Sequence, residues 1–385
     1  MRVTMMVRCL AMMRGGGETR HLAWMRELAA MGVDVDVIAG EPLLVGAARH
    51  PVTEVPATVL RTPYLRDAVY RWQNTRGFGR ATMAALHLDE EWFCRAAWRQ
   101  IASRRPLPDV VHAHAVHQAA RLRRADLPVV INLPGAPHPR YRDDLRAADA
   151  LVADGWAAER LPEILGCQVT HVPKGVDATL FTADGDSHRA ALGLADRRVV
   201  IAVGRLVPIK NMALLVDAMR TVRERISDAH LLLVGEGPEL ESLRARAAAC
   251  GVESSVTFAG YAPLEELPAY YRSADVFALT STFDNSPNVV LEAMACELPV
   301  VATDVGGVKG FVAERGGTLV PSGSAARVAD AIVSWLESAE RRRDAGTFNR
   351  RLVLERYSWR ASAAALLDVY EHVLRGHRRA ERRSA

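Results

Sequence analysis

The segment Ser281–Gly307, STFDNSPNVVLEAMACELPVVATDVGG, combines a helix start, a buried helix and a buried strand. Ser286 followed by Pro287 is typical of a helix start, with serine as the N-cap and proline at the first helical position. The N–H groups that follow, from Asn288 and Val289, have no acceptor within the helix and can bind an anion. We therefore expect a phosphate-binding helix start at this point of the chain.

Two carboxylates flank this helix start. Glu292 lies four residues after Asn288, so the two side chains share one helix face, and Asp284 lies just before the helix. A carboxylate beside an anion site is poorly suited to bind phosphate, but it can accept hydrogen bonds from sugar hydroxyls. The segment could therefore hold a ribose, a diphosphate and a second sugar in sequence. The alternative is a proline-started helix with one exposed glutamate.

Outward from this segment, strand and helix patterns alternate in both directions. The expected strands of the second half are VVIAVGR, HLLLVGEGP, SVTFAG, ADVFALTS, PVVATD and GGTLVP, and those of the first half are RVTMMV, VDVDVIAG, DVVHAHAV, LPVVINLP, ALVAD and VTHVPKG. Helices between buried strands indicate parallel sheets. The expected fold class is therefore α/β, with two doubly wound Rossmann-like domains whose strand ends face a central cleft.

A polar segment, GVDATLFTADGDSHRAALGLADRR, separates the two halves. We expect an N-terminal domain of residues 1–175, completed by the C-terminal helix 360–376, a second domain of residues 176–360, and a basic tail, 377–385. The stretch 61–105 is rich in aromatics and is expected to form helical insertions.

Composition narrows the class of partner. The net charge is +4, and the terminal sequence RGHRRAERRSA, with five arginines and one glutamate, accounts for all of it. The rest of the chain is therefore near neutral, and no nucleic-acid partner is expected. The tail is interpreted as a solvated helix end, with attraction to an anionic membrane as the alternative. Scattered cysteines, no signal peptide and no apolar run long enough to span a membrane favour a cytoplasmic location.

Only three of the 49 basic residues are lysine: Lys174, Lys210 and Lys309. In a chain so biased toward arginine, a lysine can be one that chemistry requires, because ammonium and guanidinium differ in size and hydration. In AVGRLVPIKN, Arg205 follows a strand and Lys210 comes shortly after. The two could hold one diphosphate, and the alternative is a pair of surface charges beside a loop.

A glycine-rich loop, RGGGETRH, joins the first strand to the first helix. It is not the Gly-x-Gly-x-x-Gly fingerprint, because Arg20 occupies the third place, and no Gly-Lys-Ser/Thr follows to make a P-loop. Gly15 and Gly16 nevertheless let the backbone approach a phosphate closely.

These motifs, together with DVVHAH, VPKGVDATLF, GRLVPIK, LLLVGEGP and VTFAGY, resemble the retaining family 4 glycosyltransferases of the GT-B fold along nearly the whole chain. The resemblance implies that the N-terminal domain binds the acceptor and that the C-terminal domain binds the nucleotide-sugar donor. It implies a diphosphate site made by Arg205, Lys210, Gly15, Gly16, Asn288 and Val289.

The same resemblance assigns three catalytic candidates, His114, Asp284 and Glu292. Glu292 would bind the ribose hydroxyls, Asp284 (usually glutamate in the family) would contact the donor sugar at the reacting carbon, and His114 would lie near that sugar. The nucleotide base would be surrounded by Gly235, Glu236, Gly260 and Tyr261. His112, on the same strand, is interpreted as a satisfied core or cleft-edge histidine.

Acceptor recognition is the least defined part of the resemblance. Its candidates are Glu18, which matches a frequent acid of the family, together with His138 and Arg140. Pro134 stands where the family often has histidine, and Gly310 stands where glutamate is common. Lys174 replaces a usual asparagine and is interpreted as a linker residue.

No metal or other cofactor is expected. The Asp34-x-Asp36 pair resembles a metal-binding motif, but alternation explains it as the polar face of a strand. Arg205, Lys210 and a helix start can stabilise the leaving diphosphate without a metal. The pair of carboxylates that a two-step retaining hydrolase uses is not evident, and the resemblance implies a same-face route instead.

The expected function is transfer of a sugar from a nucleoside-diphosphate sugar, UDP-sugar first and GDP-sugar next, to a small-molecule or saccharide acceptor. A lipid-linked acceptor at a membrane surface, a GT-B sugar-nucleotide epimerase and a catalytically silent sugar-nucleotide-binding module remain alternatives. A dinucleotide-dependent oxidoreductase is a further rival. The donor sugar, the acceptor, the linkage and the oligomeric state are not readable from the sequence.

Overall fold

The computed structural model describes residues 1–10, 16–42, 55–62 and 80–384. The chain forms two compact units, which we call the N-terminal unit (Met1–Pro173 with Trp359–Ala385) and the C-terminal unit (Lys174–Ser358). The boundaries expected from the sequence, after residue 175 and at residue 360, lie beside these.

The N-terminal unit is built on a parallel sheet whose described strands run in the order β3-β2-β1-β4-β5-β6-β7. The strands are β1 (Arg2–Val7), β2 (Asp34–Pro42), β3 (Ala57–Thr62), β4 (Val110–His114), β5 (Val129–Leu133), β6 (Ala150–Ala153) and β7 (Thr170–His171). Strand β1 lies at the centre, where Val3 pairs with Val35 on one side and Val110 on the other.

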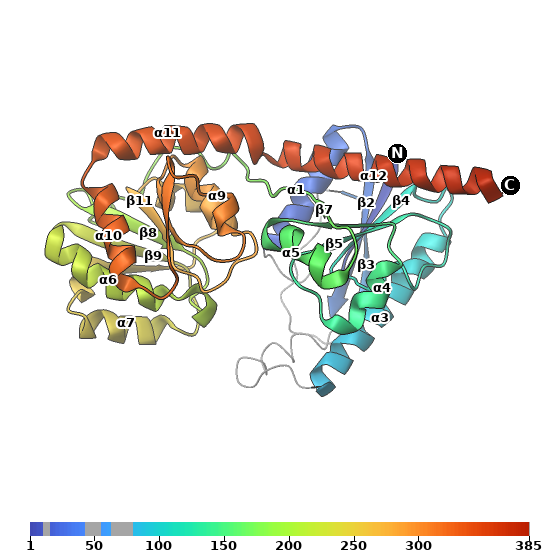
Figure 1. The fold of residues 1–385 in the computed structure, drawn as a ribbon, viewed down its shortest axis with the longest axis horizontal. Helices are drawn as coiled ribbons and strands as arrows, with labels where there is room; N and C mark the ends of the chain where they lie inside the picture. The colour runs from blue at the N-terminus through green and yellow to red at the C-terminus, as the bar shows by residue number, and fades with distance from the viewer. Residues whose placement is uncertain (11–15, 43–54, 63–79, 385) are drawn as a thin grey trace. The chain divides into compact units, whose positions relative to one another are not determined.

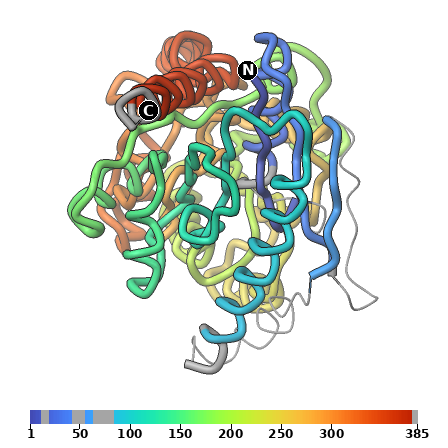
Figure 2. Tube along the Cα trace, turned by 90° about the vertical axis from the view of Figure 1, so that its right-hand side faces the viewer, coloured from blue at the N-terminus to red at the C-terminus, as the bar shows by residue number. Residues whose placement is uncertain are grey.

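Helices cover both faces of this sheet (Figures 1 and 2). On one face lie α1 (Gly16–Ala30) and α12 (Trp359–Ser384), and on the other lie α3 (Arg80–Ala102) and α5 (Gly155–Leu165). The short helices η1 (Pro139–Tyr141) and α4 (Arg142–Arg146) follow β5. Side chains alternate between the two faces, as a strand requires: Met5 packs toward α1 and α12, whereas Met6 packs toward α3.

The C-terminal unit repeats this plan with a parallel sheet in the order β10-β9-β8-β11-β12-β13. The strands are β8 (Arg198–Val203), β9 (Ala229–Val234), β10 (Val256–Gly260), β11 (Val276–Leu279), β12 (Val300–Thr303) and β13 (Gly317–Val320). The four inner strands β8, β9, β11 and β12 are almost entirely buried, because helices cover both faces, whereas the edge strands β10 and β13 are partly exposed.

One face of this second sheet carries α6 (Met212–Arg225), α7 (Leu240–Ala249) and α10 (Ala325–Leu336), and the other carries α8 (Leu267–Tyr271), α9 (Asn288–Ala295) and α11 (Ala339–Arg356) (Figure 1). Short 3-10 turns are η2 (Pro208–Lys210), η3 (Glu253–Ser255) and η4 (Val308–Gly310). The two doubly wound domains expected from the sequence are therefore confirmed.

The structure corrects one local expectation of the sequence and bears on two others. A strand, β3, occupies Ala57–Thr62, where no strand was expected, because its exposed edge position removes the apolar pattern of a buried strand. Helical insertions are confirmed at α3, and residues 63–79 lie outside the described part of the chain. The backbone of the expected basic tail continues α12 to Ser384.

Both sheets have the same order once their strands are counted from the first, and in both the order reverses beside the first strand. Such a reversal leaves a crevice at the carboxyl ends of the strands, where doubly wound proteins bind ligands. The reversal lies between β1 and β4 in one unit and between β8 and β11 in the other. The residues that follow these strands are therefore the first candidates for a ligand site.

Candidate active site

The loops after β8, β9 and β10 are held together by backbone hydrogen bonds. Gly235 donates its N–H to the Gly260 carbonyl (2.7 Å), and Leu206 donates to the Glu236 carbonyl (2.8 Å). At Gly235 the backbone has φ +138°, and an added Cβ would lie 1.9 Å from the carbonyl oxygen of Gly204. Glycine is therefore required there for close backbone approach.

Two residues proposed to surround the nucleotide base are open to solvent at these loop ends. Glu236 is exposed, and Tyr261, directly after β10, is 68% exposed. An exposed aromatic ring beside a rigid loop is a surface on which a base can stack. The assignment of Gly235, Glu236, Gly260 and Tyr261 to the base stays a prediction.

The two expected diphosphate cations follow β8 but differ in environment. Arg205 is exposed, whereas Lys210, at the end of η2, is partly buried. The Lys210 ammonium lies 2.8 Å and 3.0 Å from the two carboxylate oxygens of Asp284. The structure thus brings together the residue expected at the diphosphate and the residue expected at the donor sugar.

Asp284 is also fixed through its backbone. The N–H of Gly307 donates to the Asp284 carbonyl (2.9 Å). Gly306 has φ +53°, and a Cβ there would lie 1.9 Å from the same carbonyl oxygen. The paired glycines of the VGG sequence therefore hold the loop that carries Asp284, which places its carboxylate beside Lys210.

The expected helix start exists, but its N-cap is Pro287 rather than Ser286. Pro287 has an extended backbone, with ψ 118°, so the first helical residue is Asn288. Within the described residues, the Ser286 hydroxyl and the Asn288 amide oxygen are buried without a hydrogen-bond partner. Buried polar atoms of this kind need a partner, which a water molecule or a polar ligand at the start of α9 can supply.

Glu292 lies one turn into α9 and is only 6% exposed. The hydroxyl of Tyr271 donates a hydrogen bond to its carboxylate (2.8 Å). Burial raises the pKa of Glu292 to about 7, although the Tyr271 hydrogen bond and the charge of Lys174 act in the opposite direction. The alternative of an exposed surface glutamate is therefore wrong.

The interpretation of Lys174 as a simple linker residue is wrong. It is buried, and its ammonium donates a hydrogen bond to the carbonyl of Ser286 (2.7 Å). The scarcity of lysine in the chain was the one signal that could have identified it.

In the N-terminal unit, His114 ends β4 and its ring nitrogen Nδ1 lies 2.9 Å from the Asn132 amide oxygen. Because an amide oxygen can only accept, Nδ1 carries the proton. The ring of His21 lies against that of His114, with 4.1 Å between centroids. Asn132 and His21 were not identified from the sequence, because they come from β5 and α1.

His112 is a core residue, as interpreted. It is fully buried, and its Nδ1 lies 2.8 Å from the Tyr370 hydroxyl of α12. Burial lowers its pKa to about 3, with His114 and Arg20 adding to the effect. Arg20 itself forms a buried ion pair with Asp154 (2.6 Å), which the sequence analysis also missed.

A second polar cluster follows the same strand edge. Buried Glu90 lies 3.1 Å from the His117 ring nitrogen and accepts the backbone N–H of Gln118 (3.1 Å). Burial opposes ionisation of Glu90, but His117, Arg8 and the Gln118 N–H outweigh it and lower the pKa. Charged and hydrogen-bonding groups therefore gather where an acceptor would be expected.

Two of the remaining acceptor candidates, His138 and Arg140, lie in one exposed turn. His138 caps the 3-10 turn η1, its ring accepting the N–H of Arg140 (3.3 Å). Both side chains are exposed, as is Pro134 after β5. Gly15 and the side chain of Glu18 lie outside the described part of the chain, and Gly16 is the first residue of α1.

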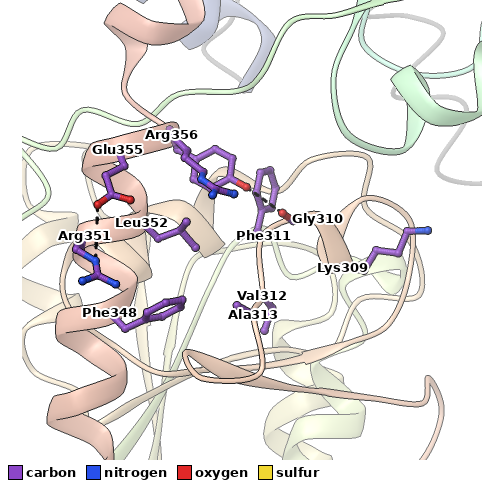
Figure 3. Close-up of a pocket in the computed structure, with 11 residues that line it drawn as sticks. Lys309, Gly310, Phe311, Val312, Ala313, Phe348, Arg351, Leu352, Glu355 and Arg356 are labelled. Atoms are coloured by element: carbon purple, nitrogen blue, oxygen red, sulfur yellow. Dashed lines mark hydrogen bonds and ion pairs between the residues drawn. The ribbon is translucent and has the colours of Figure 1, made fainter.

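A pocket of about 330 Å³ lies elsewhere in the C-terminal unit, between η4 and the end of α11 (Figure 3). Phe311, Phe348 and Leu352 supply apolar walls, and none of the expected donor residues lines it. Gly310 borders this pocket, and a Cβ there would meet nothing within 4 Å. The backbone therefore does not require glycine at this departure from the family.

The Asp34-x-Asp36 pair lies on the polar face of β2, as alternation predicted. Asp34 pairs with Arg2 (2.9 Å), and Asp36 accepts a hydrogen bond from Thr4 (2.7 Å).

In the described part of the chain, no cluster of three or more His, Cys, Asp or Glu side chains could hold a metal ion. None of the described helices combines the length and apolarity needed to cross a membrane.

Comparisons with known proteins agree with this architecture. Residues 184–352 match the family described as Glycosyl transferases group 1. The D-inositol 3-phosphate glycosyltransferase of Acidothermus cellulolyticus is 36% identical over 94% of this chain and 85% of its own length. A GDP-mannose-dependent alpha-(1-6)-phosphatidylinositol monomannoside mannosyltransferase of Mycolicibacterium smegmatis is 36% identical, over 52% of this chain and 55% of its own length. The chain thus aligns with about half the length of this mannosyltransferase.

Among solved structures, sucrose-phosphate synthase from Thermosynechococcus elongatus superposes with a TM-score of 0.79 at 22% identity, over 97% of this chain and 99% of the other. At that identity the likeness concerns the fold. Together with the relative from Acidothermus cellulolyticus, this likeness in fold shows that the chain belongs to the family 4 glycosyltransferases of the GT-B fold.

Proposed function

We propose that this protein transfers a sugar from a nucleoside-diphosphate sugar to a hydroxyl group of an acceptor, with the C-terminal unit binding the donor. One observation carries the proposal. At a single strand edge, the described structure gathers two cations, a helix start with buried unpartnered polar atoms, and a buried carboxylate. Diphosphate, ribose and sugar hydroxyls require these chemical groups.

The donor would be held along this edge. The diphosphate would contact Arg205, Lys210 and the N–H groups of Asn288 and Val289, and it would compete with Asp284 for the Lys210 ammonium. Release of Asp284 from Lys210 would free its carboxylate for a hydroxyl of the donor sugar. Glu292 would accept hydrogen bonds from the ribose.

Departure of the nucleoside diphosphate places negative charge on its oxygen, which these cations and the helix start would stabilise without a metal ion. We propose retention of anomeric configuration by a same-face route. The pair of carboxylates that a two-step retaining hydrolase uses was not evident from the sequence.

The relatives favour a polyol or saccharide acceptor, because their names include inositol phosphate and a mannoside. Glu90, His117 and the surrounding groups of the N-terminal unit offer hydrogen bonds that suit hydroxyls. For the donor base, uridine was expected first and guanosine second. Two mycobacterial relatives at 36% identity are named as GDP-mannose-dependent mannosyltransferases, so we propose guanosine first.

The five cysteines form no disulfide bond, which supports a cytoplasmic location.

A lipid-linked acceptor is a second candidate, favoured by the arginines near the end of α12 and by the phosphatidylinositol-based acceptor named for one relative. Binding of the full chain to vesicles of anionic lipid, against neutral vesicles, would distinguish it from a soluble acceptor.

The test is a binding screen of UDP, GDP, ADP and TDP, followed by transfer assays with the matching sugar nucleotides in buffer containing EDTA. Product anomers read by NMR report retention. Glu292→Ala should abolish transfer while the chain stays folded, and wild-type rates in this variant would refute the proposal. Donor conversion without acceptor would indicate an epimerase, and binding without turnover across an acceptor panel would indicate a silent binding module.

A further inference from the structure

Lys174 opens the C-terminal unit and lies buried, only 7% exposed. Lysine is almost never buried unless its charge is paired or hydrogen-bonded. Its ammonium donates to the Ser286 carbonyl (2.7 Å), across 112 residues of sequence. The beginning of the unit is thereby joined to the loop that precedes α9.

That carbonyl belongs to the residue just before the cap of α9. Pro287 follows, has no N–H of its own, and leads directly into Asn288 and Val289. An anchor on Ser286 therefore fixes the position from which the first N–H groups of the helix are presented. The unpartnered hydroxyl of Ser286 and amide oxygen of Asn288 lie in the same place.

The same ammonium acts on Glu292. Three groups bear on this buried carboxyl: Tyr271 of α8, which donates a hydrogen bond, Cys296 one turn further along α9, and Lys174. Burial raises the pKa of Glu292, while Tyr271 and the positive charge of Lys174 lower it. Tyr271 supplies no net charge, so Lys174 is the group that opposes neutralisation electrostatically.

We propose that Lys174 is a positioning residue of the donor half-site: it anchors the start of α9 through the Ser286 carbonyl, and its positive charge opposes protonation of Glu292, the carboxyl that would accept hydrogen bonds from a sugar diol. The inference rests on the proposed function for the identity of that diol. A neutral side chain at this position could anchor the carbonyl but could not supply the charge. An arginine would be bulkier than the compact ammonium, in keeping with a retained lysine.

The first test measures the Glu292 carboxyl directly and needs no donor. In protein labelled with ¹³C-glutamate, the Glu292 signal is assigned by its loss in Glu292→Gln and titrated by NMR. Lys174→Met removes both the charge and the anchor, whereas Lys174→Gln keeps a donor for Ser286. Both should raise the titration midpoint by about one pH unit, a tenfold change in proton affinity.

Lys309→Met is the matched control, because Lys309 belongs to the same unit and lines the separate pocket beside η4. It should leave the Glu292 midpoint unchanged. An unmoved midpoint in both Lys174 variants would overturn the proposal. Lys174→Gln keeps the test open if Lys174→Met fails to fold, as circular dichroism would show.

The second test follows the affinity for UDP and GDP across pH by calorimetry. Near neutral pH the Lys174 variants should bind about fivefold more weakly, and binding should recover at higher pH as Glu292 ionises. An equal loss at every pH would mark a structural role only and overturn the charge effect. If the wild type binds no nucleotide while the NMR midpoint still shifts, the proposed function fails and the Lys174–Glu292 coupling stands.

Discussion

The two units share one strand order but use their reversal points differently. In the C-terminal unit the edge is formed by backbone contacts between glycine loops and by charges near the surface, such as the Lys210–Asp284 pair. In the N-terminal unit the corresponding edge is filled by buried side chains, among them His112, His21 and the Arg20–Asp154 pair. Charges near the surface mark one edge, and buried polar side chains fill the other.

The difference teaches where specificity resides. A diphosphate is common to every donor, so a fixed set of glycines, cations and a helix start can serve. An acceptor must be recognised by side chains, and these come from elements far apart in sequence. Substitutions in the two units should therefore separate nucleotide binding from transfer.

The largest separation is expected at Lys210. Lys210→Ala removes a cation from the leaving diphosphate and should lower kcat by about 10²–10³-fold, because charge stabilisation at the leaving group is lost. It should also remove the ion-pair partner of Asp284, so urea unfolding of the same variant checks that the chain stays folded. Steady-state transfer assays measure the effect, and a change confined to the acceptor KM would contradict it.

A substitution at His114 is expected to affect transfer without affecting nucleotide binding. His114→Ala should reduce transfer by about 10²-fold if the ring assists proton movement, while the nucleoside diphosphate binds as tightly as in the wild type. Calorimetry and kinetics on the same sample separate the two quantities. Weakened nucleotide binding in this variant would remove the proposed division between the units.

Gly235→Ala tests the glycine loops by stability. A methyl group would collide with the Gly204 carbonyl, so we expect a loss of about 2–4 kcal/mol in the free energy of unfolding, typical of strained backbone sites. Gly310→Ala, where space is open, should change stability little. Urea unfolding of both variants measures the difference, and equal stabilities would show that the loops do not depend on this contact.

The smallest expected effect is a contrast in pH dependence. In the folded state the pKa of Glu292 is about 7, against an ordinary 4.5. The folded chain therefore keeps this proton at pH values where the unfolded chain has lost it, and the contribution of Glu292 to the free energy of unfolding falls as the pH rises through this window. His112 has a folded pKa of about 3 against 6.5, so its contribution falls as pH drops from 6.5 toward 3.

Removing each group should therefore change the stability profile in opposite directions. Relative to wild type, the free energy of unfolding of Glu292→Gln should rise by about 1–2 kcal/mol from about pH 5 to about pH 8. That of His112→Gln should fall by a similar amount over the same range. Denaturant titrations at the two pH values measure this. Changes of the same sign in both variants would contradict the assignment.

Regular features of the sequence predicted most of the fold. Buried strands such as β8 and β12 are continuous apolar runs between helices, and such runs are readable locally. Strand β3 was missed because its side chains alternate between exposed and half-buried positions. The helix start at Pro287 was displaced by one residue, because an extended proline and a helical one have the same φ.

The candidate donor residues could be proposed from the sequence because they lie in short motifs, whereas the residues that contact them could not. Lys174 reaches Ser286 across more than a hundred residues, and Tyr370 reaches His112 from the last helix. Contacts of this range depend on the packed fold, not on local spacing. The burial that raises the pKa of Glu292 depends on the packed fold in the same way.

The discontinuity of the N-terminal unit has a consequence for synthesis on the ribosome. Its α12 belongs to the same core as α1, where Trp24 donates a hydrogen bond to Ser362 (2.8 Å), yet it is translated after the whole of Lys174–Ser358. The later unit can therefore complete its fold first, while the apolar face of α1 waits uncovered. A nascent chain stalled before Trp359 would expose that face, which makes this interval the one in which chaperone binding or aggregation competes with folding.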